Sequence, residues 1–241
     1  MTNEQPLNIY KTNNLIMTET EIDIKRQDAL EFLKSLDDKS VDLIVTDPPY
    51  KFENTKGGGG FGSKNRTYHG ELNPISDGIT TEVLDEMFRV MKVPNIYIWC
   101  NKALIPQYLN YFLDRKCNFD LLTWHKTNPV PTCHNKYLSD TEYCLYFRKG
   151  AKLYGTYETK RKYWVTSANV EDKKKYGHPT CKPLSIMSQL VENSTLEGQL
   201  VCDPYVGSGT TAVACKQLSR SFIGCDISEE YIHTAIERLL M

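Results

Sequence analysis

The sequence lacks an apolar run long enough to cross a membrane, and its first residues contain no hydrophobic core of a signal peptide. It also lacks an excess of basic residues, because 29 lysines and arginines stand against 30 acidic residues, for a net charge of −1. No global positive field therefore attracts a polyanion, although a local basic face can still bind one. These absences predict a cytoplasmic protein that does not enter a membrane.

Metal-binding and disulfide patterns are also missing, although the chain has eight cysteines. None are spaced as Cys-x-x-Cys, and no pair of histidines completes a zinc site. Several cysteines, such as Cys100 and Cys202, lie inside apolar runs, which is typical of buried, reduced thiols. We therefore expect no metal site.

Strand-like apolar runs alternate with helical patterns along the chain. Strands are predicted at 21–24, 41–46, 95–100, 119–125, 142–148, 200–203 and 221–225, and helices at 28–36, 80–92, 103–115, 183–193, 207–218 and 229–240. This alternation predicts an α/β fold with a mostly parallel sheet. A length of 241 residues suits one domain, 1–241. Within it, residues 51–79, which include four consecutive glycines, are predicted to form a mobile loop.

A glycine-rich turn joins the predicted strand at 200–203 to the helix that follows. Gly207 and Gly209 allow a tight turn, and the start of the helix presents free N–H groups to a ligand. Asp226 follows the next strand, where an acidic side chain can accept hydrogen bonds from ribose hydroxyls. Together with Ala212 these glycines also fit the G-x-G-x-x-A dinucleotide fingerprint. An NAD-dependent enzyme is therefore an alternative at this point.

Two features count against the NAD alternative. The chain ends soon after Asp226, without a second nucleotide-binding half. Asp203 stands directly before the turn, where its carboxylate would repel a diphosphate. A carboxylate at that position instead suits a ligand with an ammonium group, such as an amino-acid moiety.

A second motif, Asp47-Pro48-Pro49-Tyr50, also follows a buried strand. It therefore lies at the carboxyl edge of the sheet, where open α/β folds bind ligands. The Asp47 carboxylate and the Pro48 carbonyl can accept both N–H bonds of an exocyclic base amine, and the prolines fix the backbone. Tyr50 offers a face on which an extruded base can stack. The alternative is a solvent-facing Pro-Pro turn.

These motifs resemble those of the amino-DNA methyltransferases, which make N6-methyladenine and N4-methylcytosine. The matching segments, in chain order, are Asp-Ala-Leu at 28–30, Asp-Pro-Pro-Tyr at 47–50, Trp-His-Lys-Thr-Asn-Pro at 124–129, His-Pro-Thr-Cys-Lys-Pro at 178–183 and Asp-Pro-Tyr-Val-Gly-Ser-Gly-Thr-Thr at 203–211. Two positions depart from the usual pattern: Tyr205 replaces a Phe, and Asp226 stands where Glu is commoner. The order of the motifs is similar to that of the β group.

The resemblance implies a fold, a cofactor and a set of site residues. The implied fold is a seven-stranded, circularly permuted α/β sheet, and the implied cofactor is S-adenosylmethionine. The implied cofactor contacts are Asp28, Lys182, Asp203, Tyr205, Gly207, Ser208, Gly209, Thr210, Thr211 and Asp226. Asp47, Pro48, Pro49 and Tyr50 are the implied catalytic residues.

Residues 149–176 are basic and aromatic with little apolar periodicity, and they stand where the β group carries target recognition. We therefore expect a small target-recognition insertion there, although charge runs are more often solvated surface. The predicted DNA contacts are Lys160, Arg161 and Lys162 from this segment, and Trp124, Lys126 and Asn128 from the segment that resembles a base-pocket lining.

The combined expectation is a site-specific DNA methyltransferase that flips out its target base and methylates the N6 amine of adenine. The alternatives are N4-cytosine methylation, RNA methylation, an NAD-dependent enzyme, and a catalytically silent DNA-binding relative. The resemblance leaves open a homodimer and a cognate restriction endonuclease as partners.

Overall fold

The computed structural model describes residues 20–49, 78–129, 131, 135, 137–169, 175 and 181–241. Tyr50, the predicted loop at 51–79 except its last two residues, and residues 178–180 lie outside the described part. Within that part, no helix combines the length and the hydropathy needed to cross a membrane. The seven described cysteines are all free and buried.

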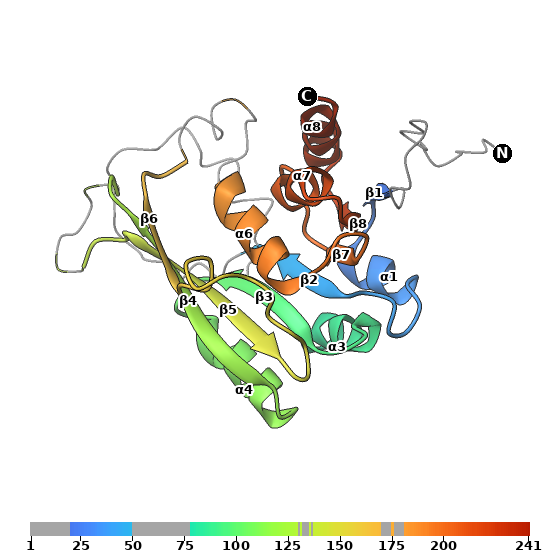
Figure 1. Ribbon diagram of the computed structural model, residues 1–241, viewed down its shortest axis with the longest axis horizontal. Helices are drawn as coiled ribbons and strands as arrows, with labels where there is room; N and C mark the ends of the chain where they lie inside the picture. Colours follow the sequence, from blue (N-terminus) through green and yellow to red (C-terminus); the bar gives the residue numbers. More distant parts are fainter. Residues whose placement is uncertain are drawn as a thin grey trace.

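A single eight-stranded sheet forms the centre of the molecule (Figure 1), with strand order β1-β8-β7-β2-β3-β5-β4-β6. The strands are β1 (Ile22–Arg26), β2 (Leu43–Thr46), β3 (Asn95–Cys100), β4 (Asn118–Lys126), β5 (Thr141–Arg148), β6 (Tyr163–Thr166), β7 (Leu200–Asp203) and β8 (Ser221–Asp226). All neighbouring pairs are parallel except the two made by β5, which runs antiparallel to β3 and to β4.

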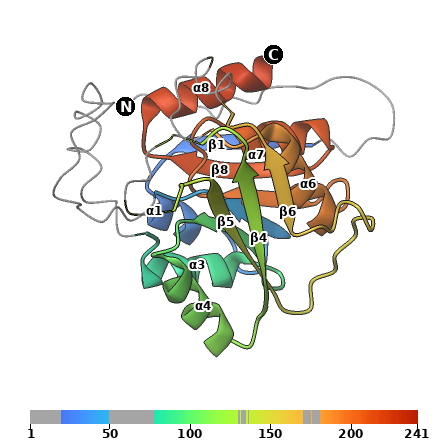
Figure 2. The ribbon, with the colours of Figure 1, turned by 90° about the vertical axis from the view of Figure 1, so that its left-hand side faces the viewer.

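Helices cover both faces of this sheet, as Figures 1 and 2 show from two directions. One layer contains α1 (Ala29–Lys34), α3 (Thr81–Val90) and α4 (Ile105–Asp114); the other contains α6 (Leu184–Ser194), α7 (Thr210–Gln217) and α8 (Glu229–Leu240). Side-chain caps begin several of these helices, for example Asp28 at α1 and Ser228 at α8.

The apolar pattern of the central strands explains the two layers. Successive side chains of a strand point to opposite faces, so a strand that is apolar throughout serves two cores. In β2, Ile44 packs against the α1 layer, whereas Leu43 and Val45 pack against the α6 layer. In β3, Ile96 faces the first core and Tyr97 the second. Continuous apolar runs are what a sheet buried on both faces requires.

The prediction of seven strands is wrong for the described residues, because β6 is an eighth. This strand lies inside the segment expected as an insertion and pairs in parallel with the edge of β4. Tyr163 and Val165 are exposed, and only Trp164 packs against the core. A four-residue edge strand with one inward side chain gives little periodicity, so the sequence pattern did not reveal it.

Strand direction places four acidic residues along one edge of the sheet. Strands β1, β8, β7 and β2 are neighbours and all parallel, so their carboxyl ends lie side by side. Asp28 follows β1, Asp226 ends β8, Asp203 ends β7 and Asp47 follows β2. Because β5 runs in the opposite direction, its first residues lie at this same edge.

Candidate active site

Asp203 is a buried carboxylate that ties the glycine turn to β2. Its Oδ1 accepts hydrogen bonds from Thr46 Oγ1 at 2.8 Å and from the Tyr205 N–H at 3.0 Å, and its Oδ2 accepts one from Thr211 Oγ1 at 2.9 Å. Burial raises the pKa of Asp203 to about 7, with a further contribution from the charge of Asp47. The side chain thus fixes the turn from within and is 2% exposed, which leaves little of it to face an ammonium group.

Gly209 gives the turn its shape for two physical reasons. Its φ is +77°, in the left-handed region that side chains rarely adopt. A Cβ on this residue would also lie 2.7 Å from Cβ of Ala235, so the absence of a side chain lets α8 pack directly on the turn. The described contacts therefore account for Gly209 through helix packing as well as turn geometry.

Arg238 of α8 holds the same turn from the other side, a role that none of the predicted site residues included. Its buried guanidinium donates to the Ser208 carbonyl at 2.7 Å, to Ser208 Oγ at 3.0 Å and to Thr210 Oγ1 at 3.0 Å. Ser208, Thr210 and Thr211 are all buried. Their side chains shape the turn, and its backbone is what remains for a ligand.

Asp226 joins the turn to the next strand. Its Oδ2 accepts the Gly207 N–H at 2.9 Å, and its Oδ1 accepts the Ser228 N–H at 2.9 Å. Burial raises the pKa of Asp226, and these N–H groups act in the opposite direction. Asp28 lies on the neighbouring strand end, where the Gln27 N–H bonds to the Asp226 carbonyl at 3.1 Å. The Asp28 carboxylate caps α1 by accepting the Leu30 N–H at 2.9 Å.

Asp47 contacts a lysine that the sequence interpretation placed at the cofactor. Nζ of Lys182 lies 2.5 Å from Asp47 Oδ2 and 3.2 Å from Glu142 Oε2. Burial alone would lower the pKa of Lys182, but the two carboxylates outweigh this effect and raise it. Pro48 is buried and Pro49 is half-buried directly after Asp47. Asp47 is therefore held between a rigid backbone and a buried cation.

The segment predicted to line a base pocket is only partly available to a ligand. Trp124 is 1% exposed and its Nε1 donates to Thr166 Oγ1 at 2.8 Å, so it is a core side chain. Lys126 forms an ion pair with Glu142. Asn128 is exposed, and its Oδ1 accepts the Ala168 N–H at 2.6 Å. Of the three, Asn128 is the one placed to meet a partner.

An open pocket of about 440 Å³ lies beside Asn128. Its lining is mostly polar and comes from three separate segments: Asn128, residues 166–169 at and after the end of β6, and Pro183 and Ser185 around the start of α6. Two lining residues lie beside Lys182: Pro183 follows it in the chain, and Asn169 Nδ2 donates to the Lys182 carbonyl at 3.3 Å. The pocket thus opens next to the segment that holds Asp47.

The three basic residues expected to contact DNA lie before β6 and are exposed. Arg161 pairs with Glu158 at 2.7 Å, and Lys162 pairs with Asp120. Exposed pairs of this kind are weak and are easily exchanged for another anion. Lys160, Arg161 and Lys162 are thus available at the surface of the molecule.

Comparison with known proteins identifies the family to which this chain is similar. The family model described as DNA methylase matches residues 41–237. Type II methyltransferase M2.LlaDCHI of Lactococcus lactis subsp. cremoris is 31% identical over 262 residues, with 97% of this chain and 96% of that protein covered. Type II methyltransferase M2.DpnII of Streptococcus pneumoniae is 30% identical over 259 residues, with 96% of each covered.

A solved structure gives the same answer at the level of the fold. The complex of M1.HpyAVI with SAM is 28% identical and superposes with a TM-score of 0.67. The match covers 91% of this chain and 100% of that one. The family model spans most of the sequence and the relatives match it nearly end to end. This chain belongs to the N6/N4 DNA methylase family.

Proposed function

We propose that this DNA methylase uses S-adenosylmethionine to methylate the N6 amine of adenine in duplex DNA. The observation that carries the proposal is the placement of Asp47 beside the glycine turn. Thr46, the residue before Asp47, donates to Oδ1 of Asp203, the residue at the start of that turn, at 2.8 Å. The predicted base-binding motif and the predicted cofactor turn are therefore adjacent, as direct transfer of a group between two ligands requires.

The residues of the turn suit a ligand that carries a ribose and a positive charge. Asp226 is a carboxylate already oriented by the N–H of Gly207 in the turn and by the N–H of Ser228 before α8, and one carboxylate can accept several more hydrogen bonds. Asp28, which follows the neighbouring strand β1, adds a second acid, and Tyr205 lies near Asp28. Asp226, Asp28 and the backbone of 207–209 would hold the cofactor. When bound, S-adenosylmethionine supplies an electrophilic methyl group on a sulfonium.

The chemistry assigned to the protein is orientation of a weak nucleophile. The lone pair of an exocyclic base amine is delocalised into the ring. Asp47 and the Pro48 carbonyl accept the two N–H bonds and favour a pyramidal nitrogen, whose lone pair is then free to attack. Lys182 holds the Asp47 carboxylate through Oδ2. Proximity and orientation supply most of the rate enhancement in such a site.

We propose adenine rather than cytosine as the target base because the resemblance associates the motif Asp-Pro-Pro-Tyr mainly with adenine N6 enzymes. Both base amines offer two N–H donors, so pocket shape must discriminate between them. The open pocket at Asn128, next to Lys182, is where we place this discrimination. Cytosine N4 is the alternative product within the same chemistry.

Contacts to DNA are proposed for the exposed basic residues before β6 and for Asn128. We treat residues 149–176 as a target-recognition insertion in a single domain of 1–241, supported by the exposure of Lys160, Arg161 and Lys162. Their charge is local, as the net charge of −1 requires. A cytoplasmic location, a homodimer and a cognate restriction endonuclease rest on the sequence and the resemblance, and they stay predictions.

The direct test of the proposal is transfer of a radiolabelled methyl group from S-adenosylmethionine to duplex DNA. We expect label in the DNA with the wild-type protein and none with Asp47→Ala. A wild-type protein that binds the cofactor but labels no duplex DNA, while it labels RNA of the same sequences, would move the substrate to RNA. A wild-type protein that labels neither duplex DNA nor RNA would contradict the proposed function.

A further inference from the structure

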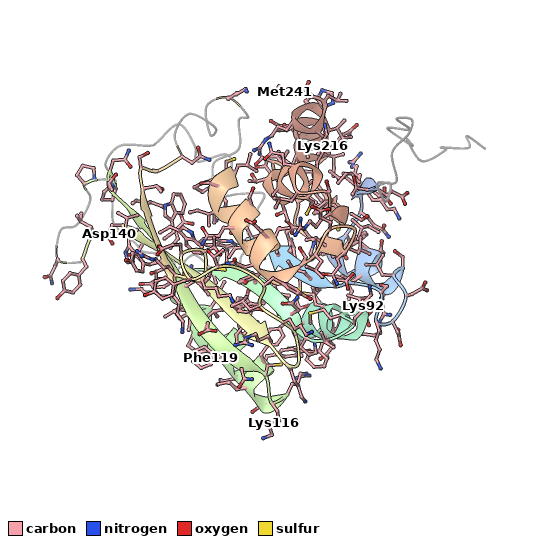
Figure 3. The ribbon with its side chains drawn as sticks, viewed as in Figure 1. Lys92, Lys116, Phe119, Asp140, Lys216 and Met241 are labelled. Atoms are coloured by element: carbon pink, nitrogen blue, oxygen red, sulfur yellow. The ribbon has the colours of Figure 1, made fainter. Side chains whose placement is uncertain are left out.

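Four side chains of alternating charge form a row at the carboxyl edge of the sheet. They are Lys126 at the end of β4, Glu142 at the start of β5, Lys182 before α6, and Asp47 after β2. Lys126 pairs with Glu142 Oε1, Glu142 Oε2 lies 3.2 Å from Lys182 Nζ, and Lys182 Nζ lies 2.5 Å from Asp47 Oδ2. Figure 3 labels Asp140, whose carbonyl accepts the Lys126 N–H at 2.7 Å, at the end of the sheet where the row begins.

Burial of these four charges carries an unfavourable desolvation free energy. The side chains of Lys126, Glu142 and Asp47 are 16%, 19% and 17% exposed, and that of Lys182 is 3% exposed. Removing charges from water is expensive, and mutual attraction in a buried pair often does no more than offset that penalty. Added stability is therefore a poor explanation for four such charges, and their position next to Asp47 is a better one.

Glu142 contributes to the row mainly through its charge. Its Oε2 lies 3.2 Å from Lys182 Nζ, close enough for strong attraction. Its backbone is fixed by the sheet, where Glu142 pairs with Trp124. The ring of Trp99 lies 5.1 Å from Lys182 Nζ. Glu142 and Trp99 thus confine a long, flexible side chain to one place.

We infer that Glu142 and Lys126 are positioning residues for methyl transfer, because they hold Lys182 where it orients the Asp47 carboxylate. Glu142 keeps the ammonium of Lys182 beside Asp47, and Lys126 balances the charge of Glu142. Neither residue needs to touch the base or the cofactor. This inference rests on the proposed function and extends it to residues that no motif of the sequence assigned to catalysis.

The directions of the pKa shifts of Glu142 and Lys182 favour the charged form of both side chains. Burial alone would raise the pKa of Glu142, but Lys182 and Lys126 outweigh this effect and lower it. Asp47 and Glu142 together raise the pKa of Lys182 against the opposite effect of burial. Without the Glu142 carboxylate, Lys182 would lose one of the two charges that raise its pKa. A change at Glu142 should therefore be measurable at Lys182.

The test uses Glu142→Gln in the full chain, with Glu237→Gln as a matched control. The control removes a carboxylate from the exposed His233–Glu237 pair on α8. We expect Glu142→Gln to reduce the single-turnover methyl-transfer rate between about 10-fold and 100-fold, the scale of a small misplacement of a reacting group. Its affinities for S-adenosylmethionine and DNA should stay within about twofold, and Glu237→Gln should match the wild type.

The titration of Lys182, followed by NMR of its ammonium group, separates a positioning role from packing. We expect a lower pKa for Lys182 in Glu142→Gln than in the wild type, and an alkaline loss of activity that begins at lower pH. If Glu142→Gln is too unstable, Lys126→Met/Glu142→Gln removes both members of the outer pair. We expect the double variant to keep the slow rate with improved folding.

The outcomes distinguish this inference from the proposed function. A wild-type rate in Glu142→Gln, or an unchanged pKa of Lys182, would overturn the inference while the wild-type protein still methylates DNA. A slow rate explained by an equal loss of cofactor affinity would overturn it as well. A wild-type protein without methyl transfer would instead contradict the proposed function, and the titration of Lys182 would still test the electrostatic part of the inference.

Discussion

Lys182 Nζ lies 2.5 Å from Oδ2 of Asp47, although 135 positions of the chain separate the two residues. The contact joins the segment before α6 to the end of β2, two parts that the sequence assigns to different ligands. It makes Lys182 a partner of the proposed catalytic carboxylate. It also gives the two motifs one shared site at the carboxyl edge of the sheet.

Asp47→Ala should abolish methyl transfer and leave cofactor affinity within a few fold, because Asp47 acts on the base amine. More than a tenfold loss of rate is expected, which corresponds to about 1.4 kcal/mol or more in the barrier. The change also removes one of the two carboxylates that pair with the buried Lys182, which should destabilise the fold. The assay should therefore be run well below the melting temperature of the variant. A variant that kept more than about a tenth of the wild-type turnover would remove Asp47 from this role.

Asp203→Asn should change how stability depends on pH. Burial raises the pKa of Asp203 to about 7, so between about pH 4 and pH 7 the folded protein retains a proton that the unfolded chain releases. The contribution of Asp203 to stability therefore falls as pH rises through this window and is constant above it. Relative to the wild type, the melting temperature of Asp203→Asn should increase from pH 5 to pH 8. A constant difference would show that Asp203 does not titrate there.

Asp226→Asn should weaken S-adenosylmethionine binding by about 1–3 kcal/mol, because a charged acceptor is replaced by a neutral one. The amide oxygen can still accept one of the N–H groups from Gly207 and Ser228, which limits damage to the turn. Glu229→Gln, in the exposed pair with Arg26, is the matched control. Calorimetry that finds equal affinity in both folded variants would place the ribose elsewhere.

Replacement of Lys160, Arg161 and Lys162 by alanine should weaken DNA binding and flatten its dependence on salt. Each lost phosphate contact should lower the slope of log affinity against log salt by about 1. The control is the triple alanine variant of Lys34, Lys92 and Lys216, which removes the same charge near the ends of α1, α3 and α7. Equal slopes for the two variants would mean that the basic segment is only solvated surface.

Much of the fold could be predicted from the sequence, because the central strands are continuous apolar runs and the helices have one apolar face. The predicted bounds of 95–100 and 200–203 coincide with β3 and β7, and those of 229–240 with α8. Strand β6 was missed, since one inward side chain gives no pattern. The reversal of β5 was also beyond the sequence, because apolar periodicity carries no information about strand direction.

That reversal explains what sequence reasoning missed in the site. Glu142 stands at the start of a strand, and the start of a parallel strand would lie at the far edge of the sheet. Only the antiparallel direction of β5 brings Glu142 to Lys182. Arg238 was missed for a similar reason, since its contact with Ser208 depends on how α8 packs on the turn. Motifs indicated the chemistry, and tertiary structure supplied the supporting side chains.

Mass spectrometry of nucleosides gives the most direct test of the central claim, which is methylation of the adenine N6 amine. Unmethylated plasmid DNA would be incubated with the full chain and S-adenosylmethionine carrying a deuterated methyl group, then digested to nucleosides. We predict deuterated N6-methyladenine and no methylated cytosine. Deuterated N4-methylcytosine without N6-methyladenine, or unlabelled DNA from a protein that binds the cofactor, would contradict the account.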